Sequence, residues 1–220
     1  AWSLLSTAYV YSALGDYDKA LEMGLKCLAL YEKIVGKEHP DYALSLGNLA
    51  VTYSDLGDYD KALEMTLEIV ALNKKIFGKK HPDYVLSLSN LSVTYSDIGD
   101  YDKALEVAIE GITLTEKIYG KEHHSYARSL SNLAMSYSDV GNYNKALEMR
   151  LECLALTEKI FGKEHTNYAW SLYNLGSEYS NLGDNDIALE ILLECFVLYE
   201  KIYGKEHPNY AMILCSLANT

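Results

Sequence analysis

The chain has 220 residues and a formal net charge of −12, from 19 Lys and Arg against 31 Asp and Glu. This acidic balance argues against a nucleic-acid or anionic-membrane surface, because phosphate binding needs clustered basic side chains. Hydrophobic residues make up 49% of the chain, which is too many for an intrinsically disordered protein. The sequence contains no apolar run of the ~18 residues that a membrane span needs. We therefore expect neither nucleic acid nor membrane as a partner.

The sequence repeats itself with a constant period of 42 residues. The block GDYDKALE at 15–22 recurs at 57–64 and 99–106, and in altered form at 141–148 and 183–190. A fixed period of this size indicates a solenoid in which each repeat is one supersecondary unit. We expect a single array over 1–220, with repeats at about 1–41, 42–83, 84–125, 126–167 and 168–209 and a partial copy at 210–220. Both ends cut the pattern, so we expect a fragment of a longer protein.

The first helix of each repeat is marked by apolar residues at i, i+3, i+4, i+7 and i+10, which lie on one helical face. In the second repeat these are Leu46, Leu49, Ala50, Tyr53 and Leu56. A residue that can accept a hydrogen bond precedes each such helix and is its expected N-cap. The expected N-caps are Asp41, Asp83, Ser125, Asn167 and Asn209.

The second helix of each repeat follows a Gly and an expected N-cap residue. The expected N-caps are Asp16, Asp58, Asp100, Asn142 and Asp184. In the second repeat the helix is predicted over about 59–77, with apolar residues on more than one face, which indicates packing on two sides. One small residue never varies and would let the paired helices approach closely: Ala20, Ala62, Ala104, Ala146 and Ala188.

Together these positions resemble the tetratricopeptide repeat. The residues that carry the resemblance are Leu46, Leu49, Ala50 and Tyr53, followed by Gly57, Tyr59 and Ala62. The ordinary repeat has about 34 residues, whereas a 42-residue repeat with a Gly-x-x-His-Pro loop is similar to the kinesin light chain type. The resemblance implies an all-α, right-handed superhelical solenoid of helix-turn-helix repeats, with about 11 helices. It also implies a protein-interaction scaffold.

Two features depart from the family pattern. The large aromatic residue usual in the middle of the second helix is replaced by Gly24, Thr66, Ala108, Arg150 and Leu192. The loop Pro is absent from two repeats, where His124 and Thr166 stand.

The repeated histidines and cysteines have structural interpretations. Equivalent loop histidines would lie too far apart to share a metal ion, so we expect each to bond nearby backbone: His39, His81, His123, His165 and His207. Cys27, Cys153 and Cys195 share one repeat position and are predicted to be buried free thiols, whereas Cys215 is the one expected to be reactive. Reduced thiols fit a cytoplasmic protein.

Tyrosines recur at three repeat positions, and we expect all three columns to form core between repeats. The columns begin at Tyr11, Tyr17 and Tyr42 and recur at the equivalent positions of later repeats, except that Asn185 ends the Tyr17 column. No convergent, non-repeating set of reactive groups occurs in the sequence. We therefore expect no enzyme activity, no cofactor and no metal.

The first helices of a two-helix solenoid line its concave side, so their residues facing away from the core form the candidate groove. An Asn column lies there: Asn48, Asn90, Asn132 and Asn174. The resemblance implies that these amides bond a peptide backbone, and the alternative is that each bonds the neighbouring repeat. The variable candidate positions are Leu86, Val93, Met135, Arg128, Trp170 and Tyr173, with Asp97 and Asp139 at the rim.

Because Arg128 is the single basic residue among the candidate groove positions, the expected ligand is a neutral or basic peptide of a partner protein. The alternative function is a spacer or sensor segment of a larger multidomain protein, with no ligand of its own. The cut ends would expose helix faces that normally stack on another repeat, so we also expect end-to-end self-association.

Overall fold

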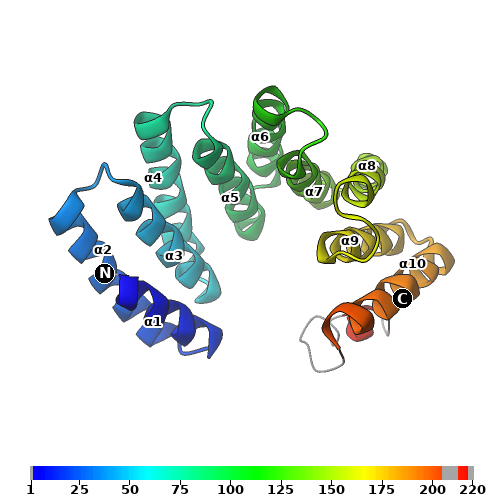
Figure 1. Ribbon diagram of the computed structural model, residues 1–220, viewed down its shortest axis with the longest axis horizontal. Helices are drawn as coiled ribbons and strands as arrows, with labels where there is room; N and C mark the ends of the chain where they lie inside the picture. The colour runs from blue at the N-terminus through cyan, green and yellow to red at the C-terminus, as the bar shows by residue number, and fades with distance from the viewer. Residues whose placement is uncertain (1, 205–212, 218–220) are drawn as a thin grey trace. The chain divides into compact units, whose positions relative to one another are not determined.

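The computed structural model describes residues 2–204 and 213–217 (Figure 1). Its internal contacts divide the chain into two compact units, Ala1–Leu114 and Thr115–Thr220, and each unit is described by itself. Every regular element among the described residues is a helix, which confirms the predicted all-α fold of helix pairs.

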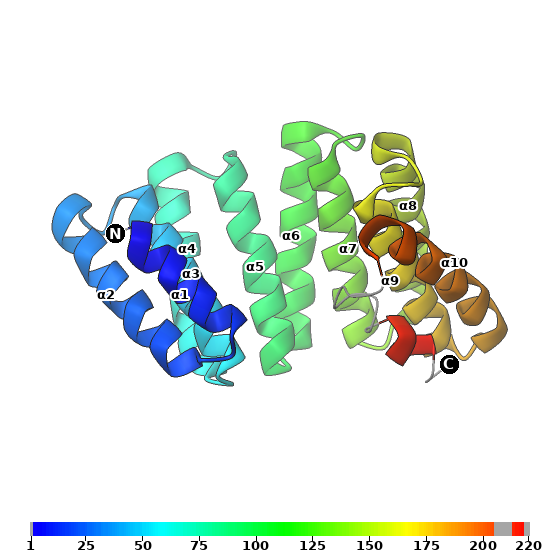
Figure 2. The same ribbon diagram turned by 60° about the horizontal axis from the view of Figure 1, so that its bottom comes forward.

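In the first unit, first and second helices alternate along the chain. They are α1 (Trp2–Ala13), α2 (Tyr17–Val35), α3 (Pro40–Asp55), α4 (Tyr59–Phe77), α5 (Pro82–Ile98) and α6 (Tyr101–Tyr119), which continues into the second unit. Figures 1 and 2 both show α1 with α2, and α3 with α4, as neighbouring antiparallel pairs. The bounds of α4 are those predicted from the sequence.

The second unit continues the alternation. Its helices are α7 (His124–Asp139), α8 (Tyr143–Phe161), α9 (Thr166–Leu182) and α10 (Asn185–Tyr203), and residues 213–217 are also helical. The second helices α2, α4, α8 and α10 each pack against the first helix before them, and α2, α4 and α8 also pack against the first helix that follows.

The loop histidine, and not the residue two positions later, caps the first helix. The Nδ1 atom of His39 accepts a hydrogen bond from the backbone N–H of Asp41 at 3.2 Å. The same bond joins His81 to Asp83, His123 to Ser125 and His165 to Asn167, at 3.1 to 3.2 Å.

The predicted caps Asp41, Asp83, Ser125 and Asn167 are therefore wrong, whereas the expectation that the histidines bond nearby backbone is confirmed. The physical reason is the extended backbone of the histidine, with ψ between 142° and 147°, from which its Nδ1 atom reaches the backbone N–H two residues later. Pro40 and Pro82 suit the first helical position, but α7 and α9 begin at the equivalent position with His124 and Thr166, so the cap does not require Pro. The equivalents Asn209 and His207 lie outside the described residues.

Three of these histidines are also held by an aromatic ring from the end of the preceding second helix. Ring centroids lie 4.2 Å apart for Phe77 and His81, and 4.5 Å apart for Phe161 and His165. Tyr119 stacks on His123 at 4.5 Å in the same way. Each loop is thus fixed by a ring contact on one side and a helix cap on the other.

The predicted caps of the second helices are confirmed in four repeats. Asp16, Asp58, Asp100 and Asn142 each accept a hydrogen bond at 3.4 Å from the backbone N–H three residues later. Asp184 also occupies the N-cap position of its helix, as predicted, but its side chain makes no capping hydrogen bond. In the first three repeats a Lys three residues after the cap also pairs with its carboxylate. The fifth repeat has Ile187 at that position, which cannot hold the Asp184 side chain.

The core of each unit is built from repeat-equivalent residues. One cluster in the first unit contains Cys27, Tyr31, Tyr42, Leu46 and Ile69. One cluster in the second unit contains Tyr168, Ala169, Leu172, Cys195, Tyr199 and Ile213. The Tyr42 column is buried throughout the described repeats, as predicted. The Tyr11 column is buried at Tyr53 and half-buried in the other repeats.

The column of tyrosines at the start of the second helices is not core. Tyr59, Tyr101 and Tyr143 are 41%, 43% and 37% exposed, so the prediction of core packing is wrong for them. These tyrosines occupy the first helical position after the turn, where the ring lies on the solvent side of the packed faces.

The invariant alanines are fully enclosed. All five have 0% exposure, and the carbonyl oxygen of Ala104 accepts a hydrogen bond at 2.9 Å from the Ser92 hydroxyl on α5. A larger side chain would push α5 and α6 apart. We expect Ala104→Leu to lower the free energy of unfolding by ~1–3 kcal/mol through overpacking. Chemical denaturation measures this loss, and an unchanged midpoint would contradict the close packing described for this position.

The histidine cap gives a second stability prediction. His165→Ala removes both the cap and the ring contact with Phe161, whereas His165→Asn restores an acceptor without the ring. We expect the Ala variant to be less stable than the Asn variant by ~0.5–2 kcal/mol, the usual contribution of an N-cap. Denaturation midpoints give the difference, and hydrogen exchange at the Asn167 amide locates it. Equal stability of the two variants would show that the cap contributes nothing.

Candidate functional site: two grooves between first helices

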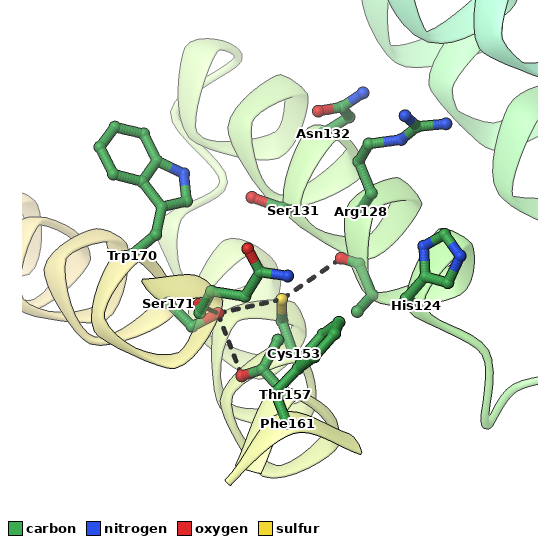
Figure 3. Close-up of a pocket in the computed structure, with 11 residues that line it drawn as sticks. His124, Arg128, Ser131, Asn132, Cys153, Thr157, Phe161, Trp170 and Ser171 are labelled. Carbon is green, nitrogen blue, oxygen red and sulfur yellow. Dashed lines mark hydrogen bonds between the residues drawn. The ribbon is translucent and has the colours of Figure 1, made fainter. Parts of the chain in front are cut away.

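Two grooves lie between consecutive first helices, one within each unit. The α3–α5 groove has a volume of about 470 Å³, and α4 supplies its floor through Ile69, Asn73 and Phe77. The α7–α9 groove has a volume of about 250 Å³, and α8 supplies its floor (Figure 3). Every residue that lines the α7–α9 groove is the equivalent, two repeats later, of one that lines the α3–α5 groove. The same surface is therefore built twice.

Half of the predicted site residues line these grooves. Asn48, Leu86 and Asn90 line the α3–α5 groove, and Arg128, Asn132 and Trp170 line the α7–α9 groove. The other six lie on the same first helices without lining either groove: Val93, Asp97, Met135, Asp139, Tyr173 and Asn174. The structure thus brings together two sets of three residues, and binding by any of them stays a prediction.

Among the residues that the structure describes, Asn48 bonds its own helix and not the neighbouring repeat. The Nδ2 atom of Asn48 donates to the backbone oxygen of Leu44, one turn earlier on the same helix, at 3.1 Å. This bond uses one N–H and leaves the amide oxygen and the second N–H of Asn48 for other partners. Asn90 is exposed, and Asn132 is half-buried at the rim of its groove (Figure 3).

The two grooves differ in charge. Among the described residues, the α3–α5 groove is lined by Asp41 and Asp83 and by no Lys or Arg. The α7–α9 groove is lined by Arg128 and His124 and, in the same part of the chain, by no carboxylate. Burial lowers the pKa of the His124 imidazole, and the neighbouring His123 and the charge of Arg128 lower it further. Arg128 is therefore the fixed positive charge of the second groove at neutral pH.

A buried ion pair contacts Ser131, one of the residues that line the α7–α9 groove. The Arg150 Nε atom is 3.7 Å from the Glu178 Oε2 atom, and the two side chains are 10% and 2% exposed. The Nη1 atom of Arg150 also donates to the backbone oxygen of Ser131 at 3.2 Å and to its hydroxyl at 2.9 Å. Glu178 accepts from the Ser138 hydroxyl at 3.0 Å. These contacts tie α8 to the first helices on both sides of it.

Sequence reasoning noted Arg150 as a departure but missed Glu178. At the equivalent positions in the first unit, Thr66 and Thr94 face each other with hydroxyl oxygens 3.4 Å apart. The signal that could have revealed the pair is that both positions change together, from two hydroxyls to opposite charges. Burial lowers the pKa of Arg150, while the Glu178 carboxylate acts in the opposite direction and favours the cation.

The two predicted rim carboxylates have different surroundings. Asp97 is exposed. Asp139 is half-buried, and its Oδ2 atom is enclosed without a hydrogen-bond partner among the described residues. Arg150 interacts electrostatically with Asp139, so the charge of this carboxylate is partly balanced from inside the protein. Asp97 is therefore the more accessible of the two carboxylates.

The cysteines lie as predicted. Cys27, Cys153 and Cys195 are buried free thiols, and Cys215 is exposed. Burial raises the pKa of the Cys195 thiol to about 12, which keeps it protonated and unreactive at neutral pH. Cys153 lies at the floor of the α7–α9 groove and donates to the backbone oxygen of Ala127 (Figure 3). This thiol thus joins α8 to α7.

No cluster of three or more metal-ligating side chains is found in the described ranges 2–204 and 213–217. Over the same ranges, none of the helices has the length and apolarity needed to cross a membrane.

The ion pair gives a test that uses the first unit as its template. Arg150→Thr leaves the Glu178 carboxylate buried without its partner, and we expect a loss of ~3–5 kcal/mol in the free energy of unfolding. The double variant Arg150→Thr with Glu178→Thr recreates the hydroxyl pair of Thr66 and Thr94, and we expect it to recover most of that loss. A double-mutant cycle in chemical denaturation measures the coupling. Simple additivity of the two single variants would contradict a direct pair.

The repeats have counterparts among known proteins. The sequence profile of the tetratricopeptide repeat family matches residues 1–75, 56–117 and 125–196. No curated protein matches the chain in sequence.

The fold is similar to that of several solved structures. A kinesin light chain-like protein of Podosopora anserina with nearly identical TPR-like repeats is 26% identical, with a TM-score of 0.75 over 90% of this chain and 94% of that one. BtubC (BKLC) from P. vanneervenii is 20% identical, with a TM-score of 0.72 over 92% of this chain and 80% of that one. A thermophilic TPR protein of Thermus thermophilus is 22% identical, with a TM-score of 0.64 over 99% of this chain and 97% of that one. The chain belongs to the tetratricopeptide repeat family.

Proposed function

We propose that the chain is a protein-interaction scaffold in which the α3–α5 groove and the α7–α9 groove each bind a peptide segment of a partner protein. The observation that carries the proposal is the residue-by-residue equivalence of the two grooves. A peptide offers the same backbone groups at regular intervals, and a surface that repeats the same amide and apolar positions is suited to such a ligand.

Different lining residues would make different contacts with a bound peptide. Asn48, Asn90 and Asn132 offer donors and acceptors that fit a peptide group of any sequence. Leu44 and Leu86 are 46% and 39% exposed at the mouth of the α3–α5 groove and can cover an apolar side chain. The backbone contacts would provide general affinity, and the apolar walls would provide selectivity.

Trp170 and Tyr173 form an aromatic wall in the second unit. Trp170 is 44% exposed and stacks on Tyr173, with ring centroids 5.4 Å apart. The Tyr173 hydroxyl lies in hydrogen-bond contact with the Ser216 hydroxyl at 3.2 Å, which fixes the ring against which Trp170 rests. A positioned, partly exposed indole is a favourable contact surface for a peptide.

The remaining predicted residues would extend the binding surface along the first helices. Val93 and Asp97 lie on α5 outside the α3–α5 groove. Met135 lies on α7 and Asn174 lies on α9, both outside the α7–α9 groove. We assign none of these residues a catalytic role. A cytoplasmic location would keep the three buried thiols reduced.

The test of this function removes one groove amide in each unit. In Asn90→Ala with Asn132→Ala, each hydrogen bond lost between the protein and the bound peptide should cost ~0.5–1.5 kcal/mol, which lowers the affinity about 2- to 13-fold. The probe is a displayed library of random heptapeptides, whose selected binders are then titrated against both proteins. Because Trp170 lies in a groove, its fluorescence in a Trp2→Phe background reports binding there.

The matched control is Asn144→Ala, which removes an exposed amide on α8 outside both grooves. Circular dichroism should show the same helix content in all variants. Unchanged affinities in the groove variant, or selected peptides that depend equally on Asn144, would contradict peptide binding at these grooves.

A further inference from the structure

The α3–α5 groove is open because one side chain is missing. Gly47 lies on α3 at a position where other repeats carry Leu5, Ser89, Ser131 and Tyr173. A Cβ atom built on Gly47 would contact only the Cδ1 atom of Ile69, at an ordinary 3.8 Å. Glycine is a poor helix former, and nothing in the local packing excludes a larger residue at this position. The space above Ile69 is therefore preformed.

A second residue keeps the floor of this groove low. Asn73 occupies the position at which Tyr31 and Tyr199 fill the core in the first and fifth repeats. Its Nδ2 atom donates at 3.1 Å to the backbone oxygen of Asp83, at the start of α5. This bond holds the amide against α5, so the small side chain leaves room beneath the groove.

The walls around this space are apolar and accessible. Leu44, Val51 and Leu86 are 46%, 59% and 39% exposed, and all three line the groove. An apolar side chain placed between them would remove its own surface and theirs from water, which is favourable. The groove therefore fits the aliphatic part of a ligand rather than a polar group.

The charged residues that line the groove are of one sign. Asp41 and Asp83 line it, with side chains 34% and 51% exposed. Asp55 and Asp97 lie near the other ends of α3 and α5, and neither helix contains a Lys or Arg. Four carboxylates without a basic residue on these two helices favour a cation and oppose an anion. The equivalent positions in the α7–α9 groove carry Asn167 in place of Asp83 and Arg128 in place of Leu44.

We propose that the α3–α5 groove, opened by Gly47 and Asn73, is a specificity pocket for an apolar side chain that is followed or preceded in a partner peptide by Lys or Arg. The proposal rests on the proposed function, because it assumes that the first-helix grooves bind peptides. In this proposal, the first unit distinguishes between peptides, and its pocket prefers an apolar side chain next to a basic one.

The test uses three capped heptapeptides in a Ser and Gly background. One carries a central Leu flanked by two Lys, one replaces both Lys with Glu, and one replaces the Leu with Ala. Isotope-edited NMR of the full chain, with concentrations raised to the millimolar range, follows the methyl groups of Leu44, Val51 and Leu86. We expect the Lys-flanked Leu peptide to bind about tenfold more tightly than either of the others, with shifts confined to these methyl groups, and to weaken as salt screens the carboxylates.

Gly47→Met fills the pocket from within the protein. The variant should fold at least as well as wild type because methionine is the better helix former. We expect it to weaken binding of the Lys-flanked Leu peptide about tenfold. The matched control is Ala71→Met, which adds a methionine side chain at an exposed position of α4 outside the groove and should change the affinity less than about twofold. Asp41→Asn with Asp83→Asn should remove the preference for Lys over Glu.

Equal binding of the Lys-flanked and Glu-flanked peptides, or full binding by Gly47→Met, would overturn the proposal. If library peptides bind in a manner that depends on Asn90 and Asn132 but ignore Gly47 and the flanking charges, the proposed function stands and this inference fails. If no peptide from the library or the series binds, both fail.

Discussion

Close approach of paired helices at the invariant alanines is the constraint on which the rest of each unit depends. Ala62 is fully enclosed and forms a cluster with Leu49 and Tyr53 of α3. A helix pair held this closely presents a fixed set of outward positions, because neither helix can rotate without burying a larger side chain at the contact. This packing therefore helps to set the distances between the groove residues on α3 and those on α5.

The side chains that fill the space around this constant contact differ in size between repeats. A Cβ atom on Gly24 would lie only 2.7 Å from the Cδ2 atom of Leu49, so α2 accepts no larger residue while Leu49 is in place. In the fifth repeat Leu192 fills the second-helix position and contacts a different neighbour, Gly176 on α9, where a Cβ atom would lie 2.8 Å from the Leu192 Cγ atom. The large aromatic residue of the family pattern is thus replaced by pairs whose sizes compensate each other.

The periodic part of the fold could be predicted because its causes are local. The apolar spacing from Leu46 to Leu56 and the polar turn at Asp58 set the helix bounds without reference to distant residues. The predicted cap of the first helix is wrong because Asp41 is the stronger capping residue by type, whereas the extended backbone of His39 puts the histidine at the cap position. The repeated aromatic pattern predicts that Tyr59 is core, whereas its place at the first helical position leaves it exposed.

The candidate site could be predicted only in part because a groove depends on three helices at once. Asn48 and Leu86 were recognised from the outward face of a single helix, but the space between them depends on what α4 lacks at Asn73. Glu178 gives no signal in the pattern of its own helix, because its partner Arg150 lies on another helix, 3.7 Å away. Pairing between residues of successive repeats leaves a mark in the sequence only as a coincidence of two substitutions.

The Arg150 and Glu178 pair also bears on how a chain of near-copies finds its correct neighbours. Similar repeats can exchange partners while folding, since a second helix meets nearly the same surface on several first helices. A misplaced α8 would set Arg150 against a residue such as Thr52 or Thr94 and would leave Glu178 enclosed without a cation. An uncompensated buried charge is far more costly than a poor apolar fit. The ion pair thus favours packing of α8 against α9 over packing of α8 against the equivalent helix of another repeat. The residues that all repeats share cannot provide this selectivity.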